Sequence, residues 1–139
     1  MPDAGRRLVS APGRTVAAVI TRYPSHVGDP TCASAVRAGD LLFLAHHAGG
    51  FDRRDYAHQT REALRALGDT LDAAGAGFEH VVQVTLWLRE LTDETRGAWD
   101  VFAEFFGDRP PARMTATSDF FDPACLVMVD GVAYVGADA

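Results

Sequence analysis

Residues 55–88 read DYAHQTREALRALGDTLDAAGAGFEHVVQVTLWL, and this stretch predicts a helix, a turn and a strand in succession. The first half carries apolar residues at helical spacing, namely Leu64, Leu67, Leu71 and Ala74. Asp52 or Asp55 can cap the start of the helix, and the glycines from Gly75 onward supply the stop. The second half, Val81–Leu88, alternates as a strand does, which places Val82, Val84, Leu86 and Leu88 on one face.

A second helix is predicted after this strand. We expect Thr92 to cap it, with Asp93 and Glu94 in the first turn, where the helix dipole favours negative charge. The apolar stripe of this helix consists of Trp99, Phe102, Phe105 and Phe106. Gly107 marks its end.

The other apolar stretches predict strands on both sides of this central unit. They are Thr15–Ile20, Ala33–Arg37, Leu41–Ala45, Met114–Ser118 and Leu126–Val135. The predicted order is β-β-β-α-β-α-β-β in one domain, residues 15–139, after a loose lead-in at residues 1–14. Two helices cannot cover both faces of a sheet of about six strands, so we expect an α+β fold with both helices on one face. The other face would be partly apolar, which predicts homo-oligomerisation through it.

Composition excludes several classes of protein. The chain has 139 residues, 47% of them hydrophobic, and a formal net charge of −6, which argues against general binding of nucleic acid or anionic membranes. All 13 basic residues are arginine, so a lysine Schiff base and a P-loop lysine are impossible. We find neither a signal-peptide pattern nor the ~20 apolar residues of a membrane helix, and we expect a cytoplasmic protein.

The run DRPPAR, residues 108–113, separates the second helix from the next strand. Its two prolines stiffen the connection, so Arg113 leaves a rigid piece of backbone. An arginine held in this way is suited to bidentate recognition of a carboxylate. The plainer interpretation is a solvated loop arginine.

His46 and His47 end the strand that begins at Leu41. Neighbouring strand residues point to opposite faces, so the pair is poorly placed to bind one metal ion, and no metal-binding motif accompanies it. Either histidine could face a pocket as a proton carrier, or be an ordinary strand-end histidine. Cys32 and Cys125 are interpreted as buried structural thiols, with a nucleophilic Cys32 as the alternative.

Taken together, these segments resemble the RidA family, also called YjgF/YER057c/UK114, the reactive intermediate deaminases. The resemblance runs from about Cys32 to Val135. The matching pieces are Val36–Asp40 leading into Leu41–Ala45, Gln59 with Leu64, Leu71–Gly75, Val81–Thr85, Phe102–Phe106 and Pro111-Ala112-Arg113.

The resemblance implies a chorismate-mutase-like fold assembled as a homotrimer with three clefts between subunits. Deaminases of this family hydrolyse enamine and imine acids to a 2-keto acid and ammonia, and they use no metal or organic cofactor. In the family the arginine of the P-A-R motif binds the substrate carboxylate, and that arginine is Arg113 here.

The chain also departs from the family pattern. Met128 stands where the deaminases carry a glutamate, while Asp130 follows on the same face of the strand, about 7 Å further along. Ala45-His46-His47 replaces a Ser-Gly-Gln sequence, Cys32 replaces a tyrosine and Trp99 replaces an asparagine.

Three hypotheses follow. The first is a divergent imine or enamine hydrolase for a bulkier acid, aromatic acids included, in which Arg113 binds the carboxylate, His46 or His47 carries protons and Asp130 replaces the glutamate. The residues expected around its substrate are Cys32, Trp99, Phe120 or Phe121, and Met128. The second is an enzyme of this scaffold that catalyses a dehydration, a cyclisation or another hydrolysis in a biosynthetic pathway. The third is a trimer that binds a small carboxylate and catalyses nothing; RNA binding is the least expected, given the net charge and the lack of lysine.

Overall fold

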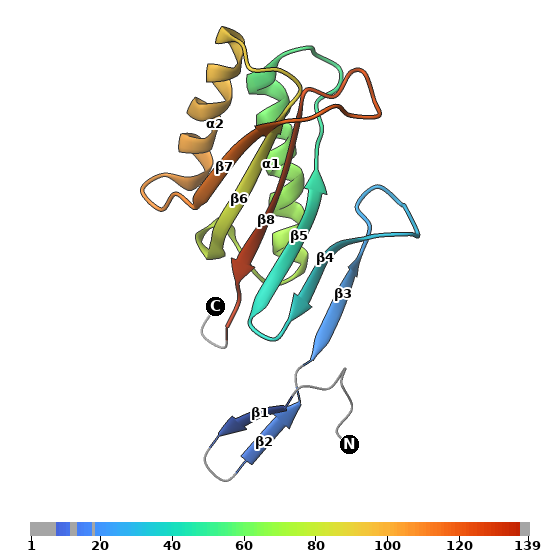
Figure 1. Ribbon diagram of the computed structural model, residues 1–139, viewed down its shortest axis with the longest axis vertical. Coiled ribbons are helices and arrows are strands. Elements are labelled where there is room, and N and C mark those ends of the chain that lie inside the picture. The colour runs from blue at the N-terminus through green and yellow to red at the C-terminus, as the bar shows by residue number, and fades with distance from the viewer. Residues whose placement is uncertain (1–7, 12–13, 18, 137–139) are drawn as a thin grey trace.

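The computed structural model describes residues 8–11, 14–17 and 19–136. Within them, six strands form one mixed sheet: β3 (Ile20–Pro24), β4 (Ala33–Ala38), β5 (Leu41–His47), β6 (Val81–Leu88), β7 (Ala112–Thr117) and β8 (Val127–Tyr134). Their order across the sheet is β3-β4-β5-β8-β6-β7 (Figure 1). Neighbours are antiparallel except for β6 and β7, which are parallel and are connected through the second helix.

Helix α1 spans Tyr56–Ala73. Its N-cap residue is Asp55, which is one of the two predicted caps. The Asp55 carboxylate accepts hydrogen bonds from the backbone N–H groups of Ala57 at 2.9 Å and His58 at 3.2 Å. At the other end, Gly75 has a φ of 74°, in the left-handed region that glycine adopts without strain. The predicted apolar face is confirmed, because Leu64, Leu67 and Leu71 have no exposed surface.

The second helix starts less simply than predicted. A 3₁₀ turn at Asp93–Thr95 precedes α2, which spans Arg96–Phe106. The Thr92 side chain makes no capping hydrogen bond, so the cap predicted there is wrong. Instead, the hydroxyl of Thr95 donates to the Thr92 carbonyl at 2.6 Å, because the chain tightens into a 3₁₀ turn before the α-helix begins.

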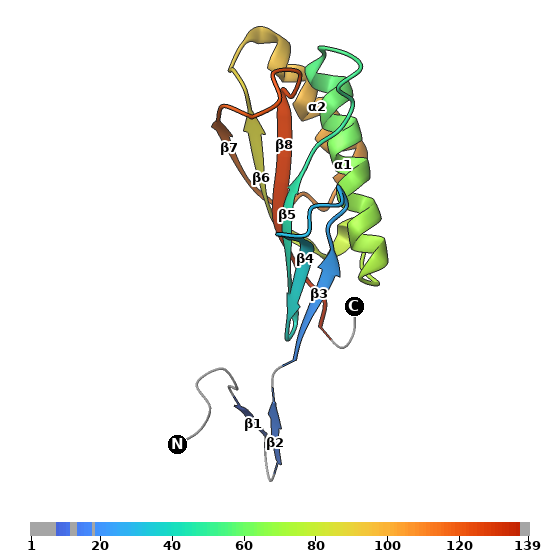
Figure 2. The ribbon, with the colours of Figure 1, turned by 90° about the vertical axis from the view of Figure 1, so that its right-hand side faces the viewer.

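Both helices lie on the same face of the sheet, which we call the helix-covered face (Figure 2). The core lies between the helices and the sheet, and its fully buried strand residues are Leu42, Val84, Leu86, Leu88, Val127 and Val129. The opposite face, called the open face, is left without helices. Exposed apolar residues of β5, β7 and β8, with exposed fractions of 39–62%, are Leu41, Phe43, Met114 and Tyr134. The predicted α+β architecture is therefore confirmed.

Two β-bulges interrupt the regular pairing of β8. Leu44 pairs with Gly131 but His47 pairs with Val129, so Ala45 and His46 together stand opposite the single residue Asp130. A second irregularity lies in β6 at Val82. Val82 is 49% exposed while Val81 is buried, so the prediction that Val82 belongs to the buried face is wrong. The extra residue shifts the alternation locally.

The N-terminal strands also differ from the prediction. The strand predicted at Thr15–Ile20 is divided between β2 (Arg14–Ala17) and β3, and residue 18 lies outside the described residues. β2 pairs with β1 (Leu8–Ala11) in a separate two-stranded sheet. Residues 1–7 and 12–13 of the expected lead-in lie outside the described residues, and the domain boundary at residue 15 stays a prediction.

Candidate functional site

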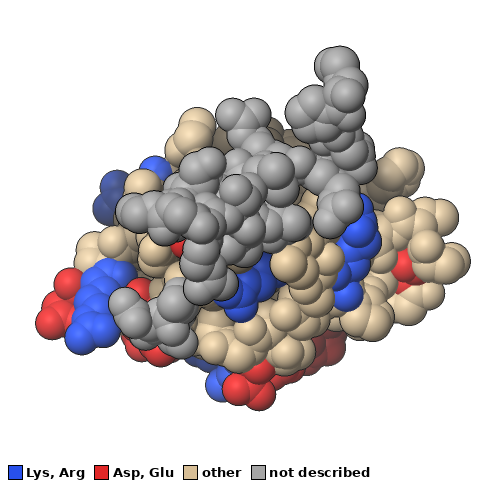
Figure 3. Space-filling model, turned by 90° about the horizontal axis from the view of Figure 1, so that it is seen from below, with Lys and Arg blue, Asp and Glu red and all other residues tan. Residues whose placement is uncertain are grey.

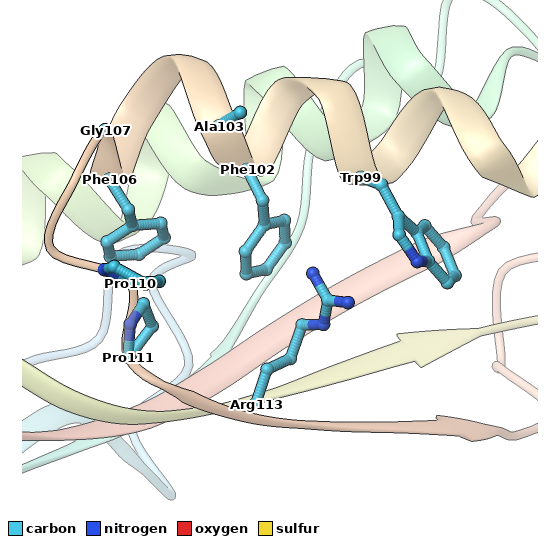
Figure 4. A pocket seen from close by; sticks show the side chains of 8 residues that line it. All are labelled: Trp99, Phe102, Ala103, Phe106, Gly107, Pro110, Pro111 and Arg113. Atoms are coloured by element: carbon cyan, nitrogen blue, oxygen red, sulfur yellow. The ribbon is translucent and has the colours of Figure 1, made fainter.

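Arg113 lies in a cavity between α2 and β7 (Figure 4). The cavity has a volume of about 390 Å³ and is lined by Trp99, Phe102, Ala103, Phe106, Gly107, Pro110, Pro111 and Arg113. Arg113 pairs with Val84 in the parallel β6–β7 ladder and therefore shares the helix-covered face. The two prolines deliver β7 to this position, as the stiffness of the DRPPAR run predicts.

The guanidinium of Arg113 is placed over two aromatic rings. Its Cζ atom lies 5.1 Å from the ring centroid of Trp99 and 5.2 Å from that of Phe102. Such contacts hold a cation by its attraction to the π-face while leaving its N–H groups available. Among the described residues, none of the ion pairs or side-chain hydrogen bonds involves Arg113. The cavity thus contains a fixed positive charge without a carboxylate beside it.

A second cavity, of about 300 Å³, lies on the open face. Its lining consists of His46, Trp87, Ser118, Asp119, Phe120, Phe121 and Met128. At its edge the Nε2 atom of His46 lies 2.9 Å from Oδ2 of Asp130. The indole N–H of Trp87 donates to the same Oδ2 at 2.8 Å. Because a carboxylate oxygen only accepts, His46 donates its Nε2–H in this contact, and the nitrogen that remains to accept a proton in the neutral ring is Nδ1.

His47 is placed on the other side of the sheet and is fully buried. Its Nδ1 lies 2.6 Å from the Ala45 carbonyl and its Nε2 lies 2.8 Å from the Thr70 hydroxyl, so both ring nitrogens are satisfied. The His26 ring stacks on it, with centroids 3.9 Å apart. Burial lowers the pKa of His47 to about 4 and also lowers the pKa of His26. His47 is therefore a core histidine, and the alternative of His47 as proton carrier does not fit this placement.

The two cysteines have different environments. Cys125 is buried, its thiol donates to the Val127 carbonyl, and burial raises its pKa, as a structural thiol requires. Cys32 is exposed, so its interpretation as a buried thiol is wrong. It lines a third hollow between β3 and β4, together with Arg22 and Tyr23. Within the described part of the chain, no three His, Cys, Asp or Glu residues are grouped so as to hold a metal ion.

The structure thus divides the predicted site residues into two groups. Arg113 and Trp99 share the cavity under α2, whereas His46, Asp130, Met128 and Phe120 gather at the open-face cavity. Arg113 pairs with Val84, and Val84 pairs with Gly131, so the two groups are back to back across about two strand spacings of the sheet.

Trp87 is the residue that the sequence analysis missed. It occurs in a strand whose apolar residues predict core packing, yet it pairs with Met128 on the open face. The signal was present in the alternation, since Trp87 lies between Leu86 and Leu88, both of which are buried.

Viewed from below, basic and acidic side chains are interspersed over the described part of that end of the molecule (Figure 3). Among the described residues, no helix combines the length and the apolar character that crossing a membrane requires.

Comparisons with known proteins agree with this fold. A RutC family protein of Pyrococcus horikoshii is 30% identical over 108 residues, which are 73% of this chain and 85% of the relative. The chloroplastic Reactive Intermediate Deaminase A of Arabidopsis thaliana is 30% identical over 89 residues, 60% of this chain and 47% of that protein.

Solved structures and a family model lead to one conclusion. A YjgF/YER057c/UK114 family member from Mycobacterium tuberculosis superposes with a TM-score of 0.76 at 29% identity, covering 84% of this chain and 100% of that one. A YjgF family member from Neisseria meningitidis has a TM-score of 0.74 at 28% identity, covering 87% and 98%. The family model described as Endoribonuclease L-PSP matches residues 30–135. The chain therefore belongs to the Endoribonuclease L-PSP family, that is, the YjgF/RidA family.

Proposed function

We propose that the chain is a hydrolase that converts an enamine or imine acid to a keto acid and ammonia, with Arg113 as the carboxylate anchor. The observation that carries this proposal is the Arg113 guanidinium, which lies over Trp99 and Phe102 in a cavity without an acidic partner among the described residues. Arg113 is exposed, so an anion can reach its guanidinium, and bidentate contacts between a guanidinium and a carboxylate are among the stronger hydrogen bonds in proteins. A Reactive Intermediate Deaminase among the relatives supports the same chemistry.

The proton transfers are assigned to His46 and Asp130. With its Nε2–H donated to Asp130, His46 accepts a proton on Nδ1 from a water molecule that attacks the imine carbon. The imine is protonated on nitrogen when water attacks, so the electron pair of the C=N π bond moves to that nitrogen and leaves a neutral amine. His46 then donates its proton to the amine nitrogen, the C–N bond breaks, and the hydroxyl group passes its proton to the departing ammonia and becomes the keto oxygen. Water is the nucleophile that a hydrolysis requires, and the Ser118 hydroxyl is engaged elsewhere, since it donates to the Asp119 carbonyl at 2.9 Å.

The two groups require a second copy of the chain to act together. Arg113 is on the helix-covered face and the His46–Asp130 pair is on the open face, so one protomer cannot present both to a small substrate. In the homotrimer that the sequence resemblance predicts, Arg113 of one protomer would meet the His46–Asp130 pair of its neighbour. The exposed Leu41, Phe43 and Met114 of the open face support burial against another copy.

Met128 favours the alternative that the chain catalyses a reaction other than the deamination of an imine. At this position the deaminases carry a glutamate, and a thioether neither accepts nor donates the protons that water activation needs. The same His46–Asp130 pair could then serve another hydrolysis, a dehydration or a cyclisation of a carboxylate substrate. Whether the protein turns over imines distinguishes the proposed deamination from these alternative reactions.

A deamination assay tests the proposal. Amino-acid oxidases generate 2-imino acids in place, and trapping by semicarbazide competes with the protein for them. We expect keto acid to form faster than the uncatalysed rate, and Arg113→Ala to lower kcat/KM by about 100-fold or more. Arg113→Lys should retain part of the activity, since it keeps the charge but loses the bidentate contact.

Arg109→Ala is the matched control, since Arg109 occupies the same loop but does not line the cavity. It should change kcat/KM less than about twofold. Size-exclusion chromatography shows whether each variant keeps its oligomeric state. Wild-type protein that accelerates no imine, or an Arg113→Ala variant as active as wild type, would overturn the proposal.

A further inference from the structure

The open-face cavity combines polar lining residues, among them His46, Ser118 and Asp119, with aromatic and apolar wall. His46 and the neighbouring Asp130 form the polar edge, whereas Trp87, Phe120 and Met128 supply apolar wall. Its volume of about 300 Å³ is at the lower end of small-molecule sites and exceeds what an aromatic ring requires. The cavity therefore suits an apolar group attached to a polar reacting centre.

The wall of the cavity is held by hydrogen bonds that link the loop before β8 to the rest of the fold. The Arg89 side chain donates to the carbonyls of Cys125 at 2.8 Å and Asp122 at 2.9 Å. Its Cζ atom also lies 5.4 Å from the Phe120 ring centroid. Buried Gln59 accepts from the Leu126 N–H at 2.7 Å and donates to the Ala124 carbonyl at 2.9 Å. The cavity is thus preformed, which lowers the entropy lost on binding.

Trp87 connects the apolar wall to the reacting pair. Its ring lies edge-on to His46, with centroids 5.9 Å apart, and its N–H fixes the Asp130 oxygen that also accepts from His46. A group that fills the cavity therefore lies beside the His46–Asp130 pair. Trp87 is a positioning residue for this pair.

We propose that the open-face cavity binds the apolar side chain of the substrate, and that the substrate is a 2-imino or 2-enamino acid with an aromatic or branched aliphatic side chain. This inference rests on the proposed function. The imine carbon of such an acid carries a carboxylate, a nitrogen and a side chain. Arg113 of the neighbouring protomer takes the carboxylate, the His46–Asp130 pair serves the nitrogen and the attacking water, and the cavity takes the side chain.

The first test compares imines made from alanine, leucine and phenylalanine. Wild-type kcat/KM should be at least about tenfold higher for the phenylalanine or leucine imine than for the alanine imine. Met128→Ala should reduce this ratio by about tenfold, because it removes a wall that only the larger side chains contact. Leu91→Ala is the matched control, because Leu91 is an exposed apolar residue in the loop after β6 and lines none of the three cavities described above. Trp87→Phe keeps a ring in the wall but removes the N–H, so it should shift the pH profile of kcat while preserving the side-chain preference.

The second test measures binding without turnover. The chain has two tryptophans, one lining each cavity, so the Trp99→Phe variant reports on Trp87 alone and the Trp87→Phe variant on Trp99 alone. Phenylacetate should change Trp87 fluorescence with saturation, acetate should not, and Met128→Ala should weaken the phenylacetate response several-fold.

The outcomes separate the two proposals. Deamination of every imine at similar rates, with no effect of Met128→Ala on the ratio, overturns the side-chain cavity and leaves the deaminase. Saturable phenylacetate binding at Trp87 without any imine turnover supports the cavity and overturns the deaminase. Neither binding nor turnover overturns both.

Discussion

His46 and His47 are adjacent in sequence, yet they belong to the two different faces of the sheet. His46 has a side chain that is 55% exposed and is paired with Asp130 on the open face. His47 is fully buried under α1, where the Thr70 hydroxyl and the Ala45 carbonyl satisfy its ring nitrogens. The difference teaches that placement decides the role: His46 is accessible to solvent beside a carboxylate, whereas burial lowers the pKa of His47 and keeps its ring neutral.

The largest effect is expected on activity. His46→Ala should lower kcat of the proposed hydrolysis by about 10²–10³-fold, because the base that accepts the water proton is lost. Its free energy of unfolding should change by less than about 0.5 kcal/mol, as for other exposed positions. Steady-state kinetics and urea unfolding of one preparation measure both. Unchanged kcat would remove His46 from the mechanism and break the comparison.

The reverse is expected for His47. His47→Ala leaves a void and deprives both the Ala45 carbonyl and the Thr70 hydroxyl of a partner, which should cost about 3–4 kcal/mol of unfolding free energy. Urea titration at a fixed protomer concentration is the measurement, since oligomer stability depends on concentration. A variant as stable as His46→Ala would show that the two faces do not differ as described.

The burial of the His47 ring should also make the unfolding free energy depend on pH, by an amount of similar size. Its pKa is about 4 in the folded chain and 6.5 when unfolded, so between these values the unfolded chain binds a proton that the folded chain does not. The unfolding free energy should therefore rise with pH from 4 to 6.5, by up to about 3 kcal/mol from this group. His26 contributes with the same sign, because its pKa is also lowered. The carboxyl group of Asp29, whose pKa is lowered by its hydrogen bonds to Thr31, acts below this range.

Urea unfolding at several pH values between 4 and 7 measures this slope. The His47→Gln variant lacks the titrating ring, so its unfolding free energy should depend less steeply on pH. Equal slopes in wild type and variant would contradict the assignment.

The smallest expected loss of stability concerns Gln59, which links helix α1 on one face to the loop that builds the cavity on the other. Gln59 reaches from α1 to the loop that builds the open-face cavity, and Gln59→Ala removes its bonds to Arg53, Ala124 and Leu126. We expect a loss of about 2–3 kcal/mol in unfolding free energy, because these buried backbone groups lose their partners. Gln83→Ala is the control, since Gln83 is only partly buried and its side chain makes no hydrogen bond within the described residues; it should cost less than about 1 kcal/mol.

Local patterns predicted the fold well. The spacing of Leu64, Leu67 and Leu71 and the cap at Asp55 depend on residues within a few turns of each other, and α1 forms where they indicate. The carboxylate-anchor candidate Arg113 was also singled out locally, from the prolines before it. Its role as an anchor remains a proposal.

The division of the candidate site could not be predicted from local patterns. A bulge depends on how β5 pairs with β8, which is more than 80 residues away in the chain. Strict alternation from Leu42 and Leu44 would place His46 on the buried face and His47 on the open face, the opposite of the observed arrangement. The contact between Trp87 and Asp130 depends on a second non-local register, that of β6 with β8.

The bulge in β5 also marks a place where the chain can change its length. Elsewhere in a strand, gaining or losing one residue moves every later side chain to the opposite face. At the bulge, Ala45 and His46 together stand opposite Asp130. A variant that lacks Ala45 would therefore keep Leu44 opposite Gly131 and His47 opposite Val129. In evolutionary terms, this is a position where an insertion or a deletion can change the open face of the sheet without disturbing the core behind it.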